Sequence, residues 1–168
     1  EVANENDIYI LRDMMKSVID GGTGGSIRWK YKFYAPAAGK TGTTNSKTDA
    51  WFIGFTPYIA MGIWIGIDDP QMKLGEKQYG SNAAMPIFAK TITGIYKLGN
   101  YFSSGKKVEI SKQEDWSIPE GIVEKNICKD TCCLNTDWCE SYKEYFIESN
   151  APNEKCEEYS NPLFRFKH

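Results

Sequence analysis

A short run of lysine, threonine and glycine is the part of this sequence best suited to chemistry. Residues 40–44 read Lys-Thr-Gly-Thr-Thr. The ammonium group of Lys40 can hold a carboxylate or assist a proton transfer. Gly42 has no side chain to block another chain, and Thr41 and Thr43 bring hydroxyl groups. Taken alone, such a lysine would be interpreted as an ordinary solvated residue of a strand edge. The residues around Lys40 must therefore show whether it has a function.

A phosphate-binding loop of the Walker A type is the first competing interpretation, because that motif also ends in Gly-Lys-Thr. It requires a glycine at position 34, where this sequence has Tyr34. A helix should also follow the loop, whereas residues of strand type follow Lys40. The glycine-rich run 21–25 is interpreted as a turn that leaves a helix, not as a phosphate loop. Nucleotide binding is therefore not favoured.

Three successive strands are predicted around Lys40. Residues 37–44 form the first, and residues 51–55 and 58–67 form a hairpin about Pro57. In the last strand, isoleucine and methionine alternate with glycine, alanine and aromatic residues, which predicts two dissimilar faces. Residues 50–67 carry no charge over 18 positions, the lower limit for a membrane-spanning helix. The alternation favours the hairpin over a membrane span.

Amphipathic helices are predicted on both sides of these strands. Residues 8–19 place Ile8, Leu11 and Ile19 on one stripe, and residues 83–98 repeat the pattern. The order helix, three strands, helix predicts an α+β fold in which helices flank an antiparallel sheet. Trp51 and Trp64 are assigned to the core or to sheet packing, and Asp49 to loop closure or lysine pairing, in preference to substrate contact or catalysis.

The last third of the chain lacks this periodicity and contains all the cysteines. Residues 101–168 are expected to form an irregular tail, separate from a domain over residues 1–100. Five cysteines leave at least one without an intramolecular partner, and they are at positions 128, 132, 133, 139 and 156. No Cys-x-x-Cys pair occurs and the single histidine is the last residue, so a zinc site is not favoured. Disulfides and reduced thiols both remain open at this point.

Composition narrows the function classes. The chain has 168 residues, 41% of them hydrophobic and 25% charged, as in ordinary globular proteins. A net charge of −2 gives no reason to expect a nucleic-acid partner. The first residues are acidic and polar, unlike a signal peptide, so any export signal is expected upstream. No cofactor and no metal are predicted.

The residues around Lys40 resemble those of the bifunctional class A penicillin-binding proteins. The matching runs cover nearly the whole chain, from the helix before the glycine-rich turn to the cysteine-containing tail. The most specific of them are Ala-Gly-Lys-Thr-Gly-Thr-Thr-Asn at 38–45, Asp-Ala-Trp-Phe-Ile-Gly-Phe-Thr-Pro at 49–57, Gly-Ile-Trp-Ile-Gly at 62–66 and Asp-Asp-Pro at 68–70. The resemblance implies the second half of a serine transpeptidase domain of the penicillin-binding and β-lactamase fold.

That resemblance also implies a function and a site. Members of the family cross-link peptidoglycan stem peptides by acyl transfer through a serine, bind β-lactams, and act at the outer face of the bacterial cell membrane. Lys40 and Thr43 are then the expected catalytic residues, with the Thr43 N–H as one oxyanion donor. Thr41, Gly42 and Thr43 are expected to bind substrate. No cofactor is implied.

The family's two other motifs, Ser-x-x-Lys and Ser-x-Asn, lie far upstream of Lys-Thr-Gly. Only 39 residues precede Lys40, and neither motif is among them. Ser103 and Ser104 fit Ser-x-x-Lys formally, but they follow the last helix in a polar run and are interpreted as loop. The nucleophilic serine and the membrane anchor are therefore expected on a missing amino-terminal part. The rival hypothesis is a non-catalytic module that binds muropeptides or docks on a partner.

The compartment that the resemblance implies is one where disulfides persist. We therefore expect at least one disulfide in the tail, between Cys139 and Cys156. Pairing of Cys128 with Cys132 or Cys133 is the alternative.

Overall fold

The computed structural model describes residues 3–44, 48–69, 72–129, 131–136 and 139–155. The chain divides into two units. One, here called the sheet unit, is Arg12–Ser117, and the other, the hairpin unit, joins Glu1–Leu11 to Ile118–His168.

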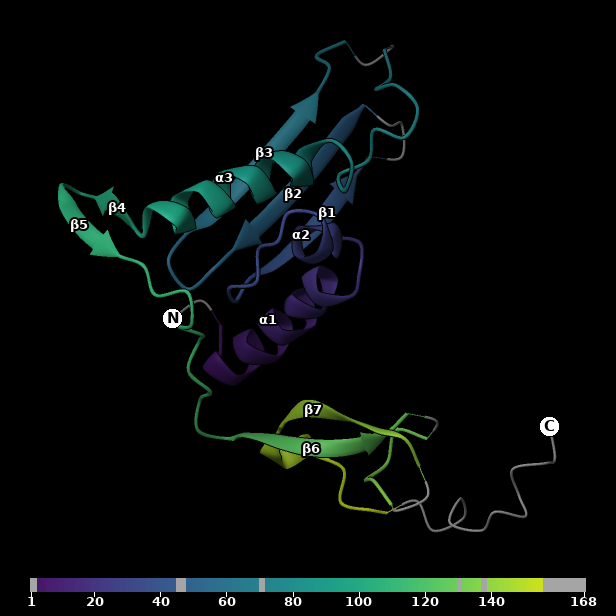
Figure 1. Ribbon diagram of the computed structural model, residues 1–168. Coiled ribbons are helices and arrows are strands. Elements are labelled where there is room, and N and C mark those ends of the chain that lie inside the picture. The colour runs from purple at the N-terminus through teal and green to yellow at the C-terminus, as the bar shows by residue number, and fades with distance from the viewer. Residues whose placement is uncertain (1–2, 45–47, 70–71, 130, 137–138, 156–168) are drawn as a thin grey trace. The chain divides into compact units, whose positions relative to one another are not determined.

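A three-stranded antiparallel sheet is the centre of the sheet unit. Its strands are β1 (Ala38–Thr43), β2 (Asp49–Phe55) and β3 (Ala60–Gly66), in the order β1-β2-β3 (Figure 1). The three strands and the hairpin predicted from the sequence are therefore confirmed. The uncharged run 50–67 forms this hairpin and not a membrane-spanning helix. Among the described residues, no helix is both long and apolar enough to cross a bilayer.

The two faces of the sheet differ, as the alternating sequence predicts. Along β2, Phe52 and its even-numbered neighbours are buried, whereas Trp51 and Ile53 are exposed. The helix α3 (Ala84–Leu98) covers the buried face (Figure 1). Its Phe88 ring lies 4.9 Å from the ring of Phe52. Gly54 makes room for that contact, because a Cβ there would lie 2.6 Å from Phe88 Cζ.

Two further helices precede the sheet. The first, α1 (Glu5–Asp20), contributes residues to both units, and the second, α2 (Ser26–Trp29), is a single turn that the sequence did not reveal. In α1 the predicted apolar stripe is only partly correct. Ile19 is fully buried in the core, whereas Ile8 and Leu11 are 48% and 58% exposed.

A small hairpin follows α3 within the sheet unit. Its strands are β4 (Asn100–Ser103) and β5 (Lys106–Glu109). Beyond it, Trp116 packs edge-on against Phe55 at 5.7 Å, and the Arg12 guanidinium lies 4.9 Å from the Trp116 ring centroid. An ion pair between Lys16 and Asp115 (2.8 Å) fixes the same segment to α1.

The hairpin unit corrects the prediction of an irregular tail. Its strands β6 (Ile122–Cys128) and β7 (Ser141–Ile147) pair antiparallel over their full length, and a 3-10 turn, η1 (Glu148–Asn150), follows. Tyr9 of α1 packs edge-on against Tyr145 of β7, with ring centroids 5.4 Å apart. Most residues of both strands are only half-buried. Because their burial does not alternate strictly from residue to residue, the sequence lacks the period-two pattern that marks a strand, and neither strand could be predicted from it.

The cysteines also differ from the specific pairing expected. Cys133 is disulfide-bonded, which confirms a disulfide in the tail. Cys139 carries a thiol outside any disulfide, as do Cys128 and Cys132, so the prediction that Cys139 is bridged is wrong. The alternative pairing of Cys128 with Cys132 or Cys133 is wrong for the same reason. Cys156, the other half of the expected bridge, lies outside the described residues.

Candidate active-site strand

The main chain of β1 presents hydrogen-bonding groups along an edge that no described strand pairs. Thr44 N–H donates to Asp49 O over 3.2 Å, which makes these two residues a hydrogen-bonded pair of the β1–β2 ladder. Antiparallel neighbours exchange bonds at every second residue. The N–H and C=O groups of Thr41 and Thr43 therefore point away from β2, toward the outer edge of the sheet. Such an edge can accept an added strand.

Lys40 lies on the exposed face of the sheet, the face opposite α3. It pairs across the ladder with Ile53, whose side chain is 51% exposed. Lys40 is itself exposed, and its Nζ donates to Thr41 O over 2.8 Å. The ammonium group is thus folded back onto the outer edge of β1, beside the groups that point away from β2. A carboxylate placed there would meet a positive charge at once.

The two threonine hydroxyls of the motif are held by residues far away in the sequence. Thr41 Oγ1 shares a hydrogen bond of 3.1 Å with Thr23 Oγ1, which belongs to the glycine-rich turn after α1. Thr43 Oγ1 accepts a hydrogen bond from Gly80 N–H at 3.2 Å. As an acceptor, the Thr43 hydroxyl keeps its own proton available to donate. Neither contact, that of Thr23 or that of Gly80, could be predicted from the residue pattern.

Gly80 lies closer to β1 than a residue with a side chain could. A Cβ at Gly80 would lie 2.8 Å from Gly42 O, and nearer still to Trp51 O. Gly80 C=O also accepts the N–H of Met85 in the first turn of α3 over 2.8 Å. The segment before α3 therefore rests directly on the β1–β2 pair at Gly42, and a glycine is required there for space alone.

The side chain of Asp49, the first residue of β2, is held by hydrogen bonds. Asp49 accepts hydrogen bonds from Thr48 Oγ1 (2.7 Å) and from Trp64 Nε1 (2.9 Å). Thr44 Oγ1 in turn accepts the N–H groups of Thr48 (3.2 Å) and Asp49 (3.1 Å). The hydrogen bond from Thr48, followed by those from Trp64 and Thr44, lowers the pKa of Asp49 from its ordinary 3.8. This arrangement agrees with the prediction that Asp49 closes a loop.

An aromatic pair continues the exposed face beside Gly42. Gly42 pairs with Trp51 across the β1–β2 ladder, and Trp51 pairs with Trp64 across β2–β3. The two indole ring centroids are 6.2 Å apart, and the side chains are 42% and 46% exposed. These tryptophans are therefore not core residues of the described chain. They lie on the same face as Lys40 and pack against each other on the sheet, so the predicted sheet packing is confirmed and the predicted core position is wrong.

The formal Ser-x-x-Lys motif lies outside this arrangement. Ser103 ends β4 and Ser104 is a turn residue with a positive φ of 49°. Both are exposed, in a separate two-stranded sheet. Lys107, the partner that Ser104 would need, forms an ion pair with Glu109 (2.6 Å). Lys107 is therefore engaged elsewhere and does not serve Ser104 as a base, as expected of a loop serine.

Comparison with known proteins decides the family. Residues 1–93 match the penicillin binding protein transpeptidase domain. This chain belongs to the penicillin-binding protein transpeptidase family. Residues 118–161 match a second family, the C-terminal domain of penicillin-binding protein 1A. The resemblance inferred from the motifs, including that of the tail, is thus confirmed.

Individual penicillin-binding proteins are similar to this chain in sequence and in structure. Penicillin-binding protein 1A of Aquifex aeolicus is 31% identical over 93% of this chain and 19% of that protein. The Rickettsia typhi protein of the same name is 43% identical over 57% of the chain and 12% of its own length. Penicillin-binding protein 1A from Haemophilus influenzae has a crystal structure that superposes with a TM-score of 0.73 and 29% identity, covering 92% of this chain and 22% of the other. The chain spans a fifth or less of the length of these two relatives.

Proposed function

We propose that this chain supplies the Lys-Thr-Gly strand of a peptidoglycan D,D-transpeptidase that also binds β-lactams. The observation that carries the proposal is the outer edge of β1. There the N–H and C=O groups of Thr41 and Thr43 point away from β2, and the Lys40 ammonium group lies beside them. This is a donor, an acceptor and a positive charge within one short strand.

Each of these groups has a place in acyl transfer. A D-Ala-D-Ala stem peptide, or a β-lactam that imitates it, would lie antiparallel along β1 and use its outward main-chain groups. Lys40 would hold the terminal carboxylate. The Thr43 N–H would stabilise the negative charge that develops on the attacked carbonyl oxygen. Gly42 would leave the face of the strand clear.

The nucleophilic serine, its lysine and the Ser-x-Asn motif would come from the sequence upstream, as would a membrane anchor. Residues 1–100 would then be the second half of the catalytic domain and residues 101–168 an appended tail. The complete enzyme would act at the extracytoplasmic face of the bacterial cell membrane.

Fluorescent penicillin tests the proposal directly. A longer protein that contains this chain and the upstream sequence should form a covalent adduct that survives denaturation, with the label on an upstream serine. The same protein with Lys40→Ala should label far more slowly. Rapid labelling that does not depend on Lys40 would exclude the proposed role of β1.

A binding module without catalysis is the second candidate. The exposed Trp51 and Trp64 side chains favour it, because exposed indoles are common recognition platforms. A module of this kind would bind muropeptides reversibly and form no penicillin adduct even with the upstream sequence present. Loss of muropeptide binding on Trp51→Ala, without any adduct in the longer protein, would favour it over the transpeptidase.

A further inference from the structure

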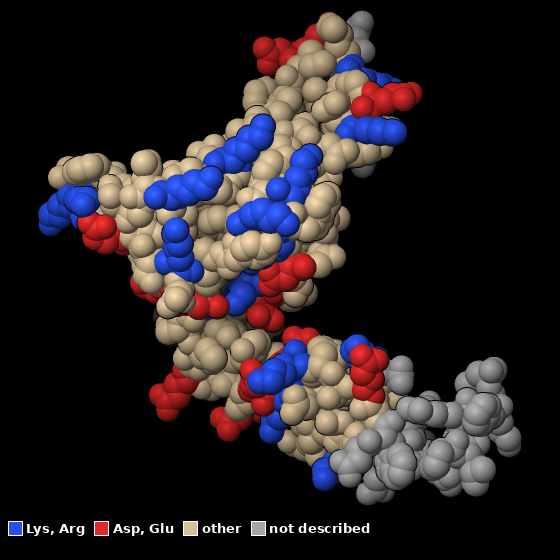
Figure 2. All heavy atoms as spheres, in the orientation of Figure 1, with Lys and Arg blue, Asp and Glu red and all other residues tan. Residues whose placement is uncertain are grey.

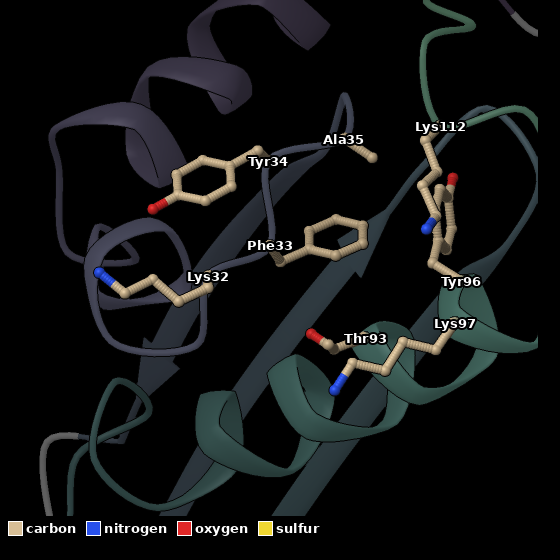
Figure 3. Close-up of a pocket in the computed structure, with 8 residues that line it drawn as sticks. All are labelled: Lys32, Phe33, Tyr34, Ala35, Thr93, Tyr96, Lys97 and Lys112. Carbon is tan, nitrogen blue, oxygen red and sulfur yellow. The ribbon is translucent and has the colours of Figure 1, made fainter.

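A cavity lies in the sheet unit, apart from the outer edge of β1. It has a volume of about 290 Å³ and opens between α3, the segment before β1 and the segment after β5 (Figure 3). Its volume suits a small ligand or a single chemical group of a larger one. The residues that line it are Lys32, Phe33, Tyr34, Ala35, Thr93, Tyr96, Lys97 and Lys112.

The charge of this lining has one sign. Lys32, Lys97 and Lys112 come from three different segments, and no carboxylate is among the lining residues. None of these lysines forms an ion pair with another described residue. Glu114, the nearest acidic residue to Lys112 in the sequence, accepts the hydroxyl hydrogen bond of Tyr58. Basic side chains also gather over α3 and around α2 on this face of the molecule, with acidic ones at the margin (Figure 2).

A buried hydroxyl in the wall of the cavity lacks a partner. Thr93 Oγ1 is inaccessible to solvent and has no hydrogen-bond partner among the described residues. Threonines inside helices usually bond the carbonyl four residues earlier. In Figure 3 the Thr93 hydroxyl instead points toward the side of the cavity where Phe33 lies. An unsatisfied buried donor is costly unless a ligand completes it.

The wall facing Thr93 is rigid before any ligand arrives. Arg28 Nη1 donates to both Phe33 O and Ala35 O, each over 2.8 Å. The Phe33 ring packs edge-on against Tyr96 at 4.9 Å. Lys32 is held with a positive φ of 57°, which a residue other than glycine adopts only under constraint from its surroundings. A fixed wall lowers the entropic cost of binding.

We propose that this cavity binds the phosphate group of an anionic ligand. Lysine ammonium groups act as point charges that suit a compact anion of more than one charge, whereas a single carboxylate would leave most of this charge uncompensated. Thr93 supplies a hydroxyl donor, and the Phe33 and Tyr96 rings exclude water from one side, which strengthens the attraction. The proposal does not depend on the transpeptidase function. Soluble phosphate compounds and phospholipid head groups share this chemistry.

Inorganic pyrophosphate is the first probe, titrated into the full 168-residue chain and followed by amide chemical shifts. Saturable shifts should appear at Phe33, Thr93 and Tyr96. Lys97→Gln and Lys112→Gln should each raise the Kd about tenfold, as expected for one charged hydrogen bond. Lys90→Gln is the matched control, because Lys90 is exposed on α3 but does not line the cavity, and it should leave the Kd unchanged.

Thr93→Val separates a ligand site from mere surface charge. It should weaken pyrophosphate binding, and it should also raise the Tm of the unliganded chain because it removes an unsatisfied buried hydroxyl. Sedimentation with phosphatidylglycerol vesicles, against phosphatidylcholine vesicles, identifies the source. Binding to the anionic vesicles that depends on Lys97 and Lys112 indicates a lipid head group, and saturation by pyrophosphate alone indicates a soluble phosphate. Absence of both, or equal losses in Lys90→Gln and Lys97→Gln, would overturn the proposal.

Discussion

Gly80 N–H donates to Thr43 Oγ1 over 3.2 Å, although Gly80 comes 37 positions after Thr43 in the sequence. This bond joins the segment that leads into α3 to the last residue of the candidate active-site strand. The position of the Thr43 hydroxyl therefore depends on a residue that has no reactive group of its own.

Gly80→Ala should distort β1 and lower the stability of the chain. The added Cβ would lie 2.8 Å from Gly42 O, and main-chain atoms cannot move aside cheaply. A loss of about 1–3 kcal/mol in the free energy of unfolding is expected, measured by urea denaturation. Gly75→Ala is the matched control in the same loop, since its Cβ would meet nothing closer than 3.8 Å. Equal stability of the two variants would contradict the contact.

Lys40→Ala in the longer protein should slow acylation by penicillin about a hundredfold or more, the loss typical of a key electrostatic group. Lys40→Arg should also be slow, because a planar guanidinium does not replace a compact ammonium group. Stopped-flow acylation rates test both. Lys90→Ala, an exposed lysine of α3, should acylate at the original rate. Unchanged rates in Lys40→Ala would mean that the motif has been misinterpreted.

The 168-residue chain by itself should form no covalent adduct with fluorescent penicillin. Acylation needs an activated serine, and Ser103 and Ser104 lie in an exposed hairpin where Lys107 is paired with Glu109. Gel fluorescence after denaturation detects any adduct, with the longer protein as the positive control. An adduct mapped to either serine would refute the assignment of this segment to a loop.

Asp49 should make the stability of the sheet unit depend on pH at the acid end. Its folded-state pKa lies below the ordinary 3.8, so its contribution is complete above that value and is lost as the pH falls through the lowered pKa. Asp49→Asn should therefore flatten the loss of stability below about pH 4. Urea midpoints between pH 7 and pH 2 measure this dependence, with Asp68→Asn as the control for charge. A profile in Asp49→Asn that is as steep as the original would exclude the hydrogen-bonded carboxylate.

The cysteines should differ in their reaction with an alkylating reagent, according to whether each is disulfide-bonded in the structure. In denatured, unreduced protein, Cys128, Cys132 and Cys139 should all be alkylated, whereas Cys133 should react only after reduction. Peptide mass mapping with two alkylating reagents distinguishes the two groups. Recovery of Cys139 solely in the reduced sample would restore the pairing that the sequence suggested.

The sheet and the two long helices could be predicted because their residues repeat with the period of the element. Residues 58–67 alternate strictly, and residues 83–98 follow the helical period. The turn α2 has only four residues, too few for any period. In β6 and β7 the alternation is weak because both strands stay half-exposed. Pairing of cysteines cannot be deduced from their spacing.

The site was predictable only where it is local in sequence. Lys40, Thr41, Gly42 and Thr43 stand together in one strand, so their motif is visible directly. Their supports are not, since Thr23 meets Thr41 from 18 residues away. Only the path of the chain through the glycine-rich turn brings these hydroxyls together.

The unpaired edge of β1 has a second consequence, for how the chain behaves in solution. Main-chain groups that can receive a substrate strand can equally receive a strand from another copy of the protein, which is how edge strands start aggregation. A charged lysine on such a strand discourages that pairing. Lys40 therefore has two roles at this edge: it opposes pairing with another copy of the strand, and it provides a positive charge for an anionic ligand. Its replacement by a neutral residue should promote self-association in the very segment that is built to bind.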